Sequence, residues 1–209
     1  MLSYDEEISG YDLKKWADWS IRYLFWSPSH SQIYSELKKL ECHGFAESRV
    51  DSDNTLRGRR LYRITQAGRE AVTAWAEHTP VDRPVLKHHA MLRVMFGHLS
   101  SPKRLKEILR DHIADVSRIE REATLDARGA EFQSGWAYSQ IVLNWARRHY
   151  AAERSLAQQL IEDIDAAEAT LAEAANDENA EYRHPVPGRW REVEQRVRQA
   201  DKGDAVAGP

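Results

Sequence analysis

Two local patterns stand next to each other in residues 29–69 and restrict how the N-terminal region can fold. The first is a Ser-rich helix start, Ser29-His30-Ser31-Gln32-Ile33-Tyr34-Ser35. The second is an arginine-rich segment, Leu56-Arg57-Gly58-Arg59-Arg60-Leu61-Tyr62-Arg63-Ile64-Thr65, whose last residues alternate between apolar and polar as in a β-strand. Together they predict a helix with small polar groups on one face, followed by a basic two-stranded ribbon.

Capping residues and periodic apolar positions predict two helices before the arginine-rich segment. Ser9 or Gly10 is the expected N-cap of the first helix, whose apolar face consists of Tyr11, Leu13, Trp16, Ala17 and Ile21. Pro28 interrupts this pattern, and Ser29 is expected to cap the second helix, which Gly44 ends. The spacing of the apolar residues in the second helix predicts a buried stripe of Ile33, Leu37 and Leu40. Its polar side is then expected to face outward.

A hairpin and a third helix are predicted to follow. Residues 45–50 and 61–64 alternate apolar and polar side chains, and residues 51–54 have the composition of a turn, so the loop between the strands forms a wing. Thr65 is expected to cap a helix from Gln66 to about His78. Its predicted inner side carries Ala67, Ala71 and either Ala74 or Trp75. This order of elements is that of a winged helix-turn-helix.

The exposed side of the second helix is suited to the major groove of DNA, because small hydroxyls and an amide allow close approach and the first turn has free backbone N–H groups for a phosphate. Gln32 is expected to pair with adenine, and His30 and Ser35 to read base edges or bind phosphate. Lys38 is expected to hold the DNA backbone. The predicted DNA-binding residues of this helix are Ser29, His30, Ser31, Gln32, Tyr34, Ser35 and Lys38. Ser29 also caps the helix, and packing is the alternative role of Tyr34.

The wing supplies the second predicted set of DNA contacts, Arg57, Arg59 and Arg60, which can enter an adjacent minor groove or clamp phosphates. Residues 29–69 hold eight Lys+Arg against five Asp+Glu, whereas the whole chain has a formal net charge of −3 at pH 7. The positive charge is therefore local. Because an arginine-rich loop is by itself more often a solvated turn, a winged-helix module that binds a protein partner without DNA is the alternative hypothesis.

The second half of the chain is predicted to be helical, beginning after a linker at residues 80–84. A helix from Val85 to Phe96 is followed by a longer one that Ser101 caps and Pro102 begins. After a break near residues 129–135, a third helix is expected to carry one long apolar stripe, consisting of Tyr138, Ile141, Val142, Trp145, His149, Ala152, Leu156, Leu160, Ile164, Ala167 and Leu171.

So long a stripe needs a partner helix, and we expect that partner in a second copy of the chain. A two-fold homodimer would place two DNA-reading helices about one turn of DNA apart, roughly 34 Å, and would imply a palindromic operator. The alternative is an antiparallel pair formed by the two long helices within one chain. The predicted fold is thus mainly α with a small β-hairpin: a winged-helix DNA-binding domain at residues 1–80, a long-helix dimerisation and effector domain at 81–175, and a loosely ordered tail at 176–209.

Aromatic side chains suggest a pocket for a flat, small aromatic effector, with Trp75, Trp136 and Trp145 as candidates. The histidines show no compact metal-ligand spacing, and His88 and His89 are adjacent and expected to point to different helix faces. We therefore predict neither a metal site nor a cofactor.

Neither an enzyme nor a membrane protein is predicted. The chain lacks a phosphate-cradling glycine loop and a nucleophile motif. It also lacks a run of about eighteen apolar residues and a basic-then-apolar signal peptide, so the expected compartment is the cytoplasm.

Four stretches, in this order, resemble the PadR family of bacterial transcriptional regulators: SGYDL at 9–13, FWSPSHSQIY at 25–34, LKKLECHG at 37–44 and YRITQAGR at 62–69. Residues 86–99 are similar to the start of the helical C-terminal domain in the longer PadR subclass. The resemblance implies a homodimeric repressor that a small molecule releases from its operator; well-known members respond to phenolic acids or amphipathic multidrug ligands. Because family members have a longer helix before the first stretch, the native start is expected upstream of Met1.

Overall fold

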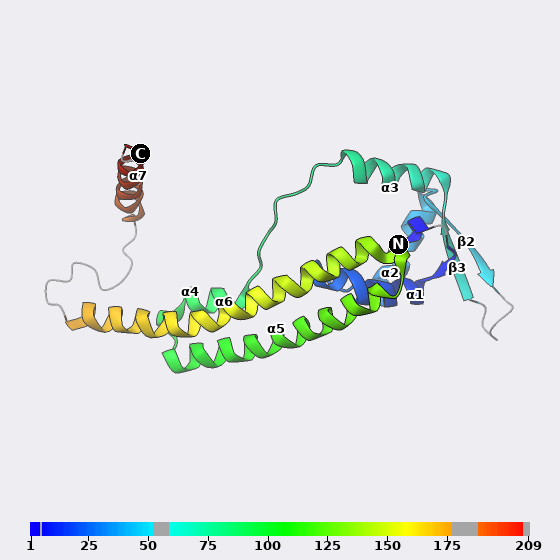
Figure 1. The fold of residues 1–209 in the computed structure, drawn as a ribbon. Helices are drawn as coiled ribbons and strands as arrows, with labels where there is room; N and C mark the ends of the chain where they lie inside the picture. The colour runs from blue at the N-terminus through cyan, green and yellow to red at the C-terminus, as the bar shows by residue number, and fades with distance from the viewer. Residues whose placement is uncertain (5, 52–58, 177–187, 207–209) are drawn as a thin grey trace.

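The computed structural model describes residues 1–4, 6–51, 59–176 and 188–206. A small sheet and short helices lie at one end of two long helices, and a final helix stands apart from that pair (Figure 1). This arrangement confirms the predicted fold class, a winged helix followed by a long-helix region. None of the described helices is both long and apolar enough to cross a membrane.

The winged helix is built from residues 2–78. Its elements are η1 (Leu2–Tyr4), β1 (Ile8–Ser9), α1 (Gly10–Ser20), η2 (Ile21–Tyr23), α2 (His30–Cys42), β2 (Ala46–Asp51), β3 (Arg59–Ile64) and α3 (Gln66–His78). The side chains of Ser9, Ser29 and Thr65 each accept a hydrogen bond from the backbone N–H three residues on, which confirms all three predicted N-caps. Gly44 has a φ of 71°, as predicted for the residue that ends α2.

The sheet contains one more strand than the sequence predicted. Its order is β1-β3-β2, and both neighbouring pairs are antiparallel. Ser9 lies opposite Leu61, and Ala46 lies opposite Ile64. Strand β1 is only two residues long, which is too short to produce an alternating pattern in the sequence.

Helix α3 has the predicted bounds but not the predicted inner side. Ala67, Ala71, Ala74 and Trp75 are all exposed, and Gly68 is the buried residue of this helix. A cavity of about 390 Å³ separates Ala71 from the core residues Leu13 and Leu37 of the winged helix, so the alanine side of α3 is left open. The helix is anchored at its first turn instead, by close approach to the turn before β2.

The C-terminal half is helical, as predicted. Its elements are α4 (His89–Met95), η3 (Gly97–Leu99), α5 (Pro102–Glu131), η4 (Ser134–Trp136), α6 (Ala137–Asn176) and α7 (Trp190–Val206). Helix α4 begins four residues later than expected, because the His88 side chain accepts the backbone N–H of Met91 (3.2 Å) and caps the helix there. Helix α7 lies in the tail, and the loose order expected there stays a prediction.

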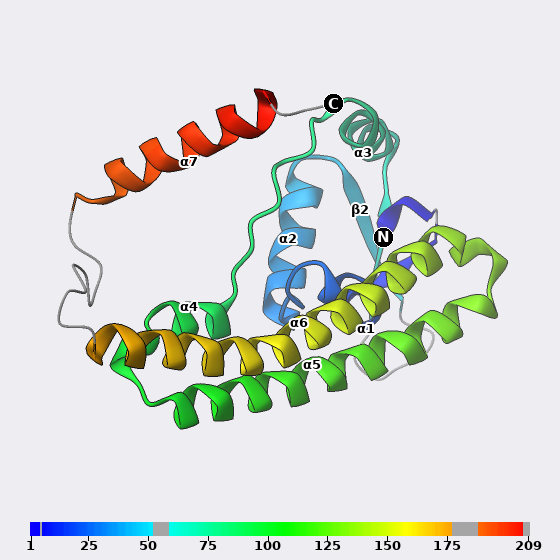
Figure 2. The same ribbon diagram turned by 60° about the vertical axis from the view of Figure 1, so that its left-hand side comes forward.

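Helices α5 and α6 pack against each other along their length, and both views show them antiparallel (Figures 1 and 2). The intrachain pair, which the sequence left as the alternative to a dimer, is therefore formed. Near the winged helix its core consists of Ala123, Ala127, Ala130, Leu143 and Ala146, with Tyr23 inserted; toward the other end it consists of Ala90, Leu105, Leu109 and Ile164. Small alanines on facing positions allow the two helices to approach closely.

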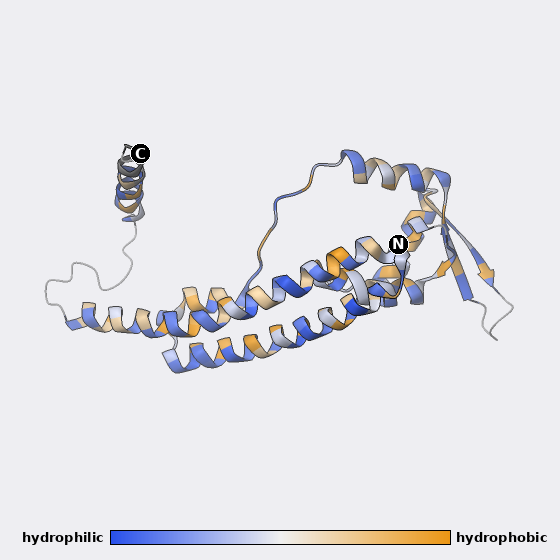
Figure 3. Cartoon of the chain, viewed as in Figure 1, coloured by the Kyte–Doolittle hydropathy of each residue, from blue (hydrophilic) through white to orange (hydrophobic). Residues whose placement is uncertain are grey.

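The inner face of α6 is not the stripe that the sequence predicted. Leu143, Ala146, Ala157 and Ile164 are the buried residues of this helix. Of these, only Ile164 belongs to the predicted stripe, and most of the large members of that stripe lie on a neighbouring, exposed face. In Figure 3, hydrophobic and hydrophilic residues are interspersed along the whole of α6. One face of α6 thus packs on α5, and a second apolar face remains exposed.

We predict that Gly68→Ala destabilises the winged helix by about 1–3 kcal/mol, because a Cβ at this position would meet the backbone carbonyl of Phe45. Gly129→Ala is the matched control, since a Cβ at Gly129 in α5 would meet no described residue outside its own helix segment within 4 Å. It should stabilise the chain by about 0.5–1 kcal/mol through helix propensity. Urea unfolding followed by circular dichroism measures both changes, and equal effects of the two would contradict the packing of α3.

Candidate nucleic-acid interface

The outer side of α2 is polar and exposed, as predicted. Leu37 is buried, with Ile33 and Leu40 half-buried, so the apolar stripe faces the core. All seven predicted contact residues of this helix are exposed: Ser29, His30, Ser31, Gln32, Tyr34, Ser35 and Lys38. The helix therefore presents hydroxyls, an amide and a lysine along one solvent-facing side, next to the β2–β3 ribbon (Figure 1).

The start of α2 is held by a reciprocal pair of hydrogen bonds. The Gln32 backbone N–H donates to Ser29 Oγ (3.3 Å), and the Ser29 backbone N–H donates to Gln32 Oε1 (2.7 Å). Bidentate pairing of a glutamine with adenine uses the same amide oxygen. The predicted reading role of Gln32 would thus share this oxygen with the cap, and its contact with a base remains a prediction.

Helix α1 supports two of the other predicted contact residues. The ring of His30 stacks on Tyr11 with a centroid separation of 5.9 Å and an interplanar angle of 13°. The Tyr34 ring lies against Gly10, where a Cβ would meet it. Tyr34 therefore packs against Gly10, which agrees with one of the two roles that the sequence left open. Ser31, Ser35 and Lys38 are exposed without this support from α1.

Two of the three wing arginines, Arg59 and Arg60, have carboxylate partners within the chain. Arg57 lies outside the described residues. Arg59 and Arg60 are consecutive in β3, so their side chains lie on opposite faces of the strand. Arg59 is paired with Asp12 and donates to Ser9 Oγ (3.0 Å).

Arg60 is engaged on the other face of the ribbon. It donates to Ser48 Oγ (3.1 Å) and lies 3.8 Å from a carboxylate oxygen of Glu41. Contact of either arginine with a DNA phosphate would compete with these carboxylate partners. DNA contact by Arg59 and Arg60 stays a prediction.

A polar junction that the sequence did not reveal joins the winged helix to the long helices. The Tyr23 hydroxyl donates to Asp126 in α5 (2.6 Å), and Arg22 contacts Asp126 (3.0 Å) and Glu122 (3.3 Å). The Tyr150 hydroxyl of α6 donates to the Tyr23 carbonyl (3.3 Å). Burial, and then the neighbouring Asp126, raise the pKa of the Tyr23 hydroxyl, so it stays a neutral donor.

The three candidate effector tryptophans lie in different surroundings. Trp75 is 66% exposed on α3. Trp145 stacks on His149, with a ring-centroid separation of 4.9 Å and an interplanar angle of 7°. Trp136 packs on Trp19 of α1, with a ring-centroid separation of 4.9 Å. Together with Trp16, Trp19 and Gly129 it lines a cavity of about 320 Å³. This cavity lies between the winged helix and the loop that joins α5 to α6. Sequence reasoning placed Trp16 only on the apolar face of its helix and missed Trp19.

Two histidines that are far apart in the sequence meet in the fold. Nε2 of His88, at the end of the linker, lies 2.7 Å from Glu153 Oε1, and Nε2 of His112 lies 2.8 Å from the same oxygen. The expectation that the histidines form no compact ligand group is therefore wrong for this pair. Burial works to raise the pKa of the Glu153 carboxyl, but hydrogen bonds from His112 and His88 more than offset it and hold that pKa below its ordinary value.

Comparison with known proteins agrees with this geometry. Residues 1–74 match the model of the transcriptional regulator PadR-like family. The winged-helix part of this chain is thus similar to that family. The resemblance of the four stretches of sequence to this family is therefore confirmed.

Bacillus subtilis PadR, a negative transcriptional regulator, is 32% identical to this PadR-like chain over 108 residues, which are 51% of this chain and 58% of that relative. The crystal structure of Bacillus subtilis PadR in complex with operator DNA matches 78% of this chain and 94% of that chain, with a TM-score of 0.67 and 25% identity. The structure of the same protein in complex with p-coumaric acid matches 78% of this chain and 91% of that chain, with a TM-score of 0.62 and 23% identity.

Proposed function

We propose that this PadR-like protein is a sequence-specific, DNA-binding repressor that acts in the cytoplasm as a homodimer and is released from a palindromic operator by a small effector. The observation that carries the DNA-binding role is the exposed polar side of α2, which begins at a capped N-terminus and lies beside a ribbon that carries arginines. The operator complex of Bacillus subtilis PadR supports the same role.

The side chains of α2 divide into two groups in this proposal. Ser31 and Ser35 make the groove contacts, because they are exposed and α1 does not hold them. The first backbone N–H groups of the helix and Lys38 bind phosphates. Arg59 and Arg60 contribute after they release Asp12 and Glu41, so binding by the wing is weaker than its arginine content suggests.

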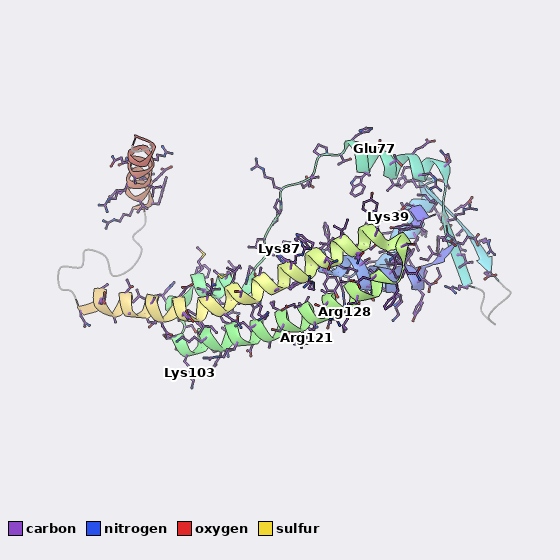
Figure 4. The ribbon with its side chains drawn as sticks, viewed as in Figure 1. Lys39, Glu77, Lys87, Lys103, Arg121 and Arg128 are labelled. Atoms are coloured by element: carbon purple, nitrogen blue, oxygen red, sulfur yellow. The ribbon has the colours of Figure 1, made fainter. Side chains whose placement is uncertain are left out.

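We predict that Lys38→Ala weakens operator binding and lowers the slope of log affinity against log salt by about 0.9, the contribution of one neutralised phosphate. Lys103→Ala is the matched control, because Lys103 lies at the end of α5 that is distant from the winged helix (Figure 4). Fluorescence anisotropy with the DNA upstream of the protein's own gene, at several salt concentrations, measures the slope.

A second variant in the same assay tests α2 without loss of its cap. Gln32→Glu keeps an acceptor for the Ser29 backbone N–H and places a carboxylate where a DNA phosphate would approach. It should fold normally and lose operator binding, whereas Gln158→Glu on exposed α6 should bind as before. Unchanged DNA binding by both Lys38→Ala and Gln32→Glu would leave the protein-binding winged-helix module as the better hypothesis.

The dimer proposal is supported by the exposed apolar face of α6. Tyr138, Ile141, Trp145, Leu156 and Leu171 recur along one side of this helix, and their exposed fractions range from 50% at Trp145 to 84% at Tyr138. Because α5 already covers the other apolar face, a second copy of the chain is the partner that we propose here. A two-fold axis would then set two α2 helices about one turn of DNA apart, roughly 34 Å.

Ile141→Glu is therefore expected to shift the protein from dimer to monomer, because it places a charge in the proposed apolar interface. The matched control is Val81→Glu, at a linker residue that is 97% exposed. Light scattering coupled to size-exclusion chromatography gives the mass of each variant. A dimer of unchanged stability in Ile141→Glu would place the interface elsewhere.

The effector proposal rests on the cavity that Trp16, Trp19 and Trp136 line. Its walls come from α1, which follows the N-terminal strand of the winged helix, and from the α5–α6 loop. A flat aromatic molecule bound here would contact both parts of the chain at once and shift their relative position. The p-coumaric acid complex of Bacillus subtilis PadR makes this compound a suitable probe.

We predict that p-coumaric acid weakens operator binding by this protein. Trp136→Ala should lower the affinity of the protein for p-coumaric acid about 2–10-fold, because one aromatic face is lost. Trp75→Ala, on exposed α3, should leave the affinity unchanged. Isothermal titration calorimetry with p-coumaric acid measures the affinity of each variant. Equal losses in the two variants would remove the cavity at Trp136 as the effector site.

A further inference from the structure

We propose that His88, His112 and Glu153 form a binding site for a divalent transition-metal ion of the Zn²⁺ type. The three residues come from three separate segments: His88 ends the linker, His112 lies in α5 and Glu153 lies in α6. Their candidate ligand atoms all lie within 4.8 Å of one another. This site is independent of the DNA-binding role proposed above.

The burial of the three side chains suits a bound ion. The exposed fractions are 14% for His88, 18% for Glu153 and 26% for His112, so each is largely withdrawn from solvent yet reachable. The rings of His88 and His112 are 5.0 Å apart, and both Nε2 atoms point at the same carboxylate oxygen. The three candidate ligand atoms are therefore close enough together for one ion to contact all of them.

The donor set selects the kind of ion. Two imidazoles and one carboxylate match the tetrahedral His₂Glu set of zinc sites, in which a fourth position is left to water or another ligand. Imidazole is a ligand for zinc, copper, nickel and iron, whereas Ca²⁺ and Mg²⁺ prefer oxygen ligands throughout. The ion is thus expected to be a transition metal.

The distances require only a small adjustment. Metal–ligand bonds of about 2.0–2.1 Å in a tetrahedron separate the ligand atoms by about 3.3 Å. The two histidine nitrogens now lie 2.7 and 2.8 Å from Glu153 Oε1 as hydrogen-bond partners, so these two separations have to widen by about half an ångström. The two nitrogens themselves lie within 4.8 Å of each other.

Metal binding would also change which ring nitrogen of His88 carries the proton. In the metal-free state Nδ1 accepts the Met91 backbone N–H, so in a neutral ring the proton is on Nε2, which donates to Glu153. A metal on Nε2 needs that lone pair, and the proton then resides on Nδ1, which can no longer accept. The Met91 amide therefore loses its partner when the metal binds, and it reports occupancy of this site specifically.

The position of His88 indicates what the metal would do. The linker runs from α3 to α4 and meets the α5–α6 pair at this residue (Figure 2). A metal bound to His88, His112 and Glu153 would join the end of that linker to both long helices. It would therefore limit the positions that the linker can take as it leaves the winged helix.

The test is titration of the metal-free full chain with Zn²⁺, and with Co²⁺ as a spectroscopic probe. We expect one ion per chain, loss of at least about tenfold in affinity for both His112→Ala and Glu153→Gln, and a shift of the Met91 amide signal in the nuclear magnetic resonance spectrum. Circular dichroism establishes that each variant is folded. His89→Ala and His98→Ala are matched controls, because both side chains are exposed and neither belongs to the group.

Two outcomes would overturn the proposal. One is the absence of stoichiometric Zn²⁺ binding by the folded wild-type protein. The other is binding that His112→Ala and Glu153→Gln leave unchanged, or that the two control variants weaken as much. In either case the three residues are a hydrogen-bonded contact that holds the linker, with no role for a metal ion.

Discussion

Packing of α5 on α6 forms the helix pair to which the winged helix is attached. Facing alanines let the two helices come close, and Tyr23 of the winged helix inserts into the same core. Because Tyr23 also donates a hydrogen bond to Asp126, the winged helix is attached to the pair by an apolar contact and a partly buried hydrogen bond together.

The same contact accounts for the other features of the C-terminal half. It brings His112 and Glu153 together, although they are distant in the sequence, and it turns the inner face of α6 away from solvent. The apolar face that remains exposed is then available to a second chain. The cavity at Trp136 forms where the loop between the two helices meets α1. The proposed dimerisation, effector binding and metal binding would thus be three separate uses of one helix pair.

In the winged helix, two side chains that the sequence predicted to contact DNA form hydrogen bonds within the chain. Gln32 holds the N-terminus of α2, and Arg59 is held by Asp12. Residues of a type that commonly contacts DNA are here satisfied within the chain, because the same amide and guanidinium groups also suit caps and carboxylates. The proposed recognition of DNA would therefore compete with these contacts within the chain.

Features that depend on local chemistry could be predicted from the order of residues alone. The caps at Ser9, Ser29 and Thr65 and the left-handed Gly44 are of this kind, because contacts within a few residues produce them. Packing between distant segments set the others: the buried face of α6, the third strand, the opposite partners of Arg59 and Arg60, and the meeting of His88 with Glu153. Periodicity identifies an apolar face but not the neighbour that covers it, and residues distant in sequence become neighbours only through packing.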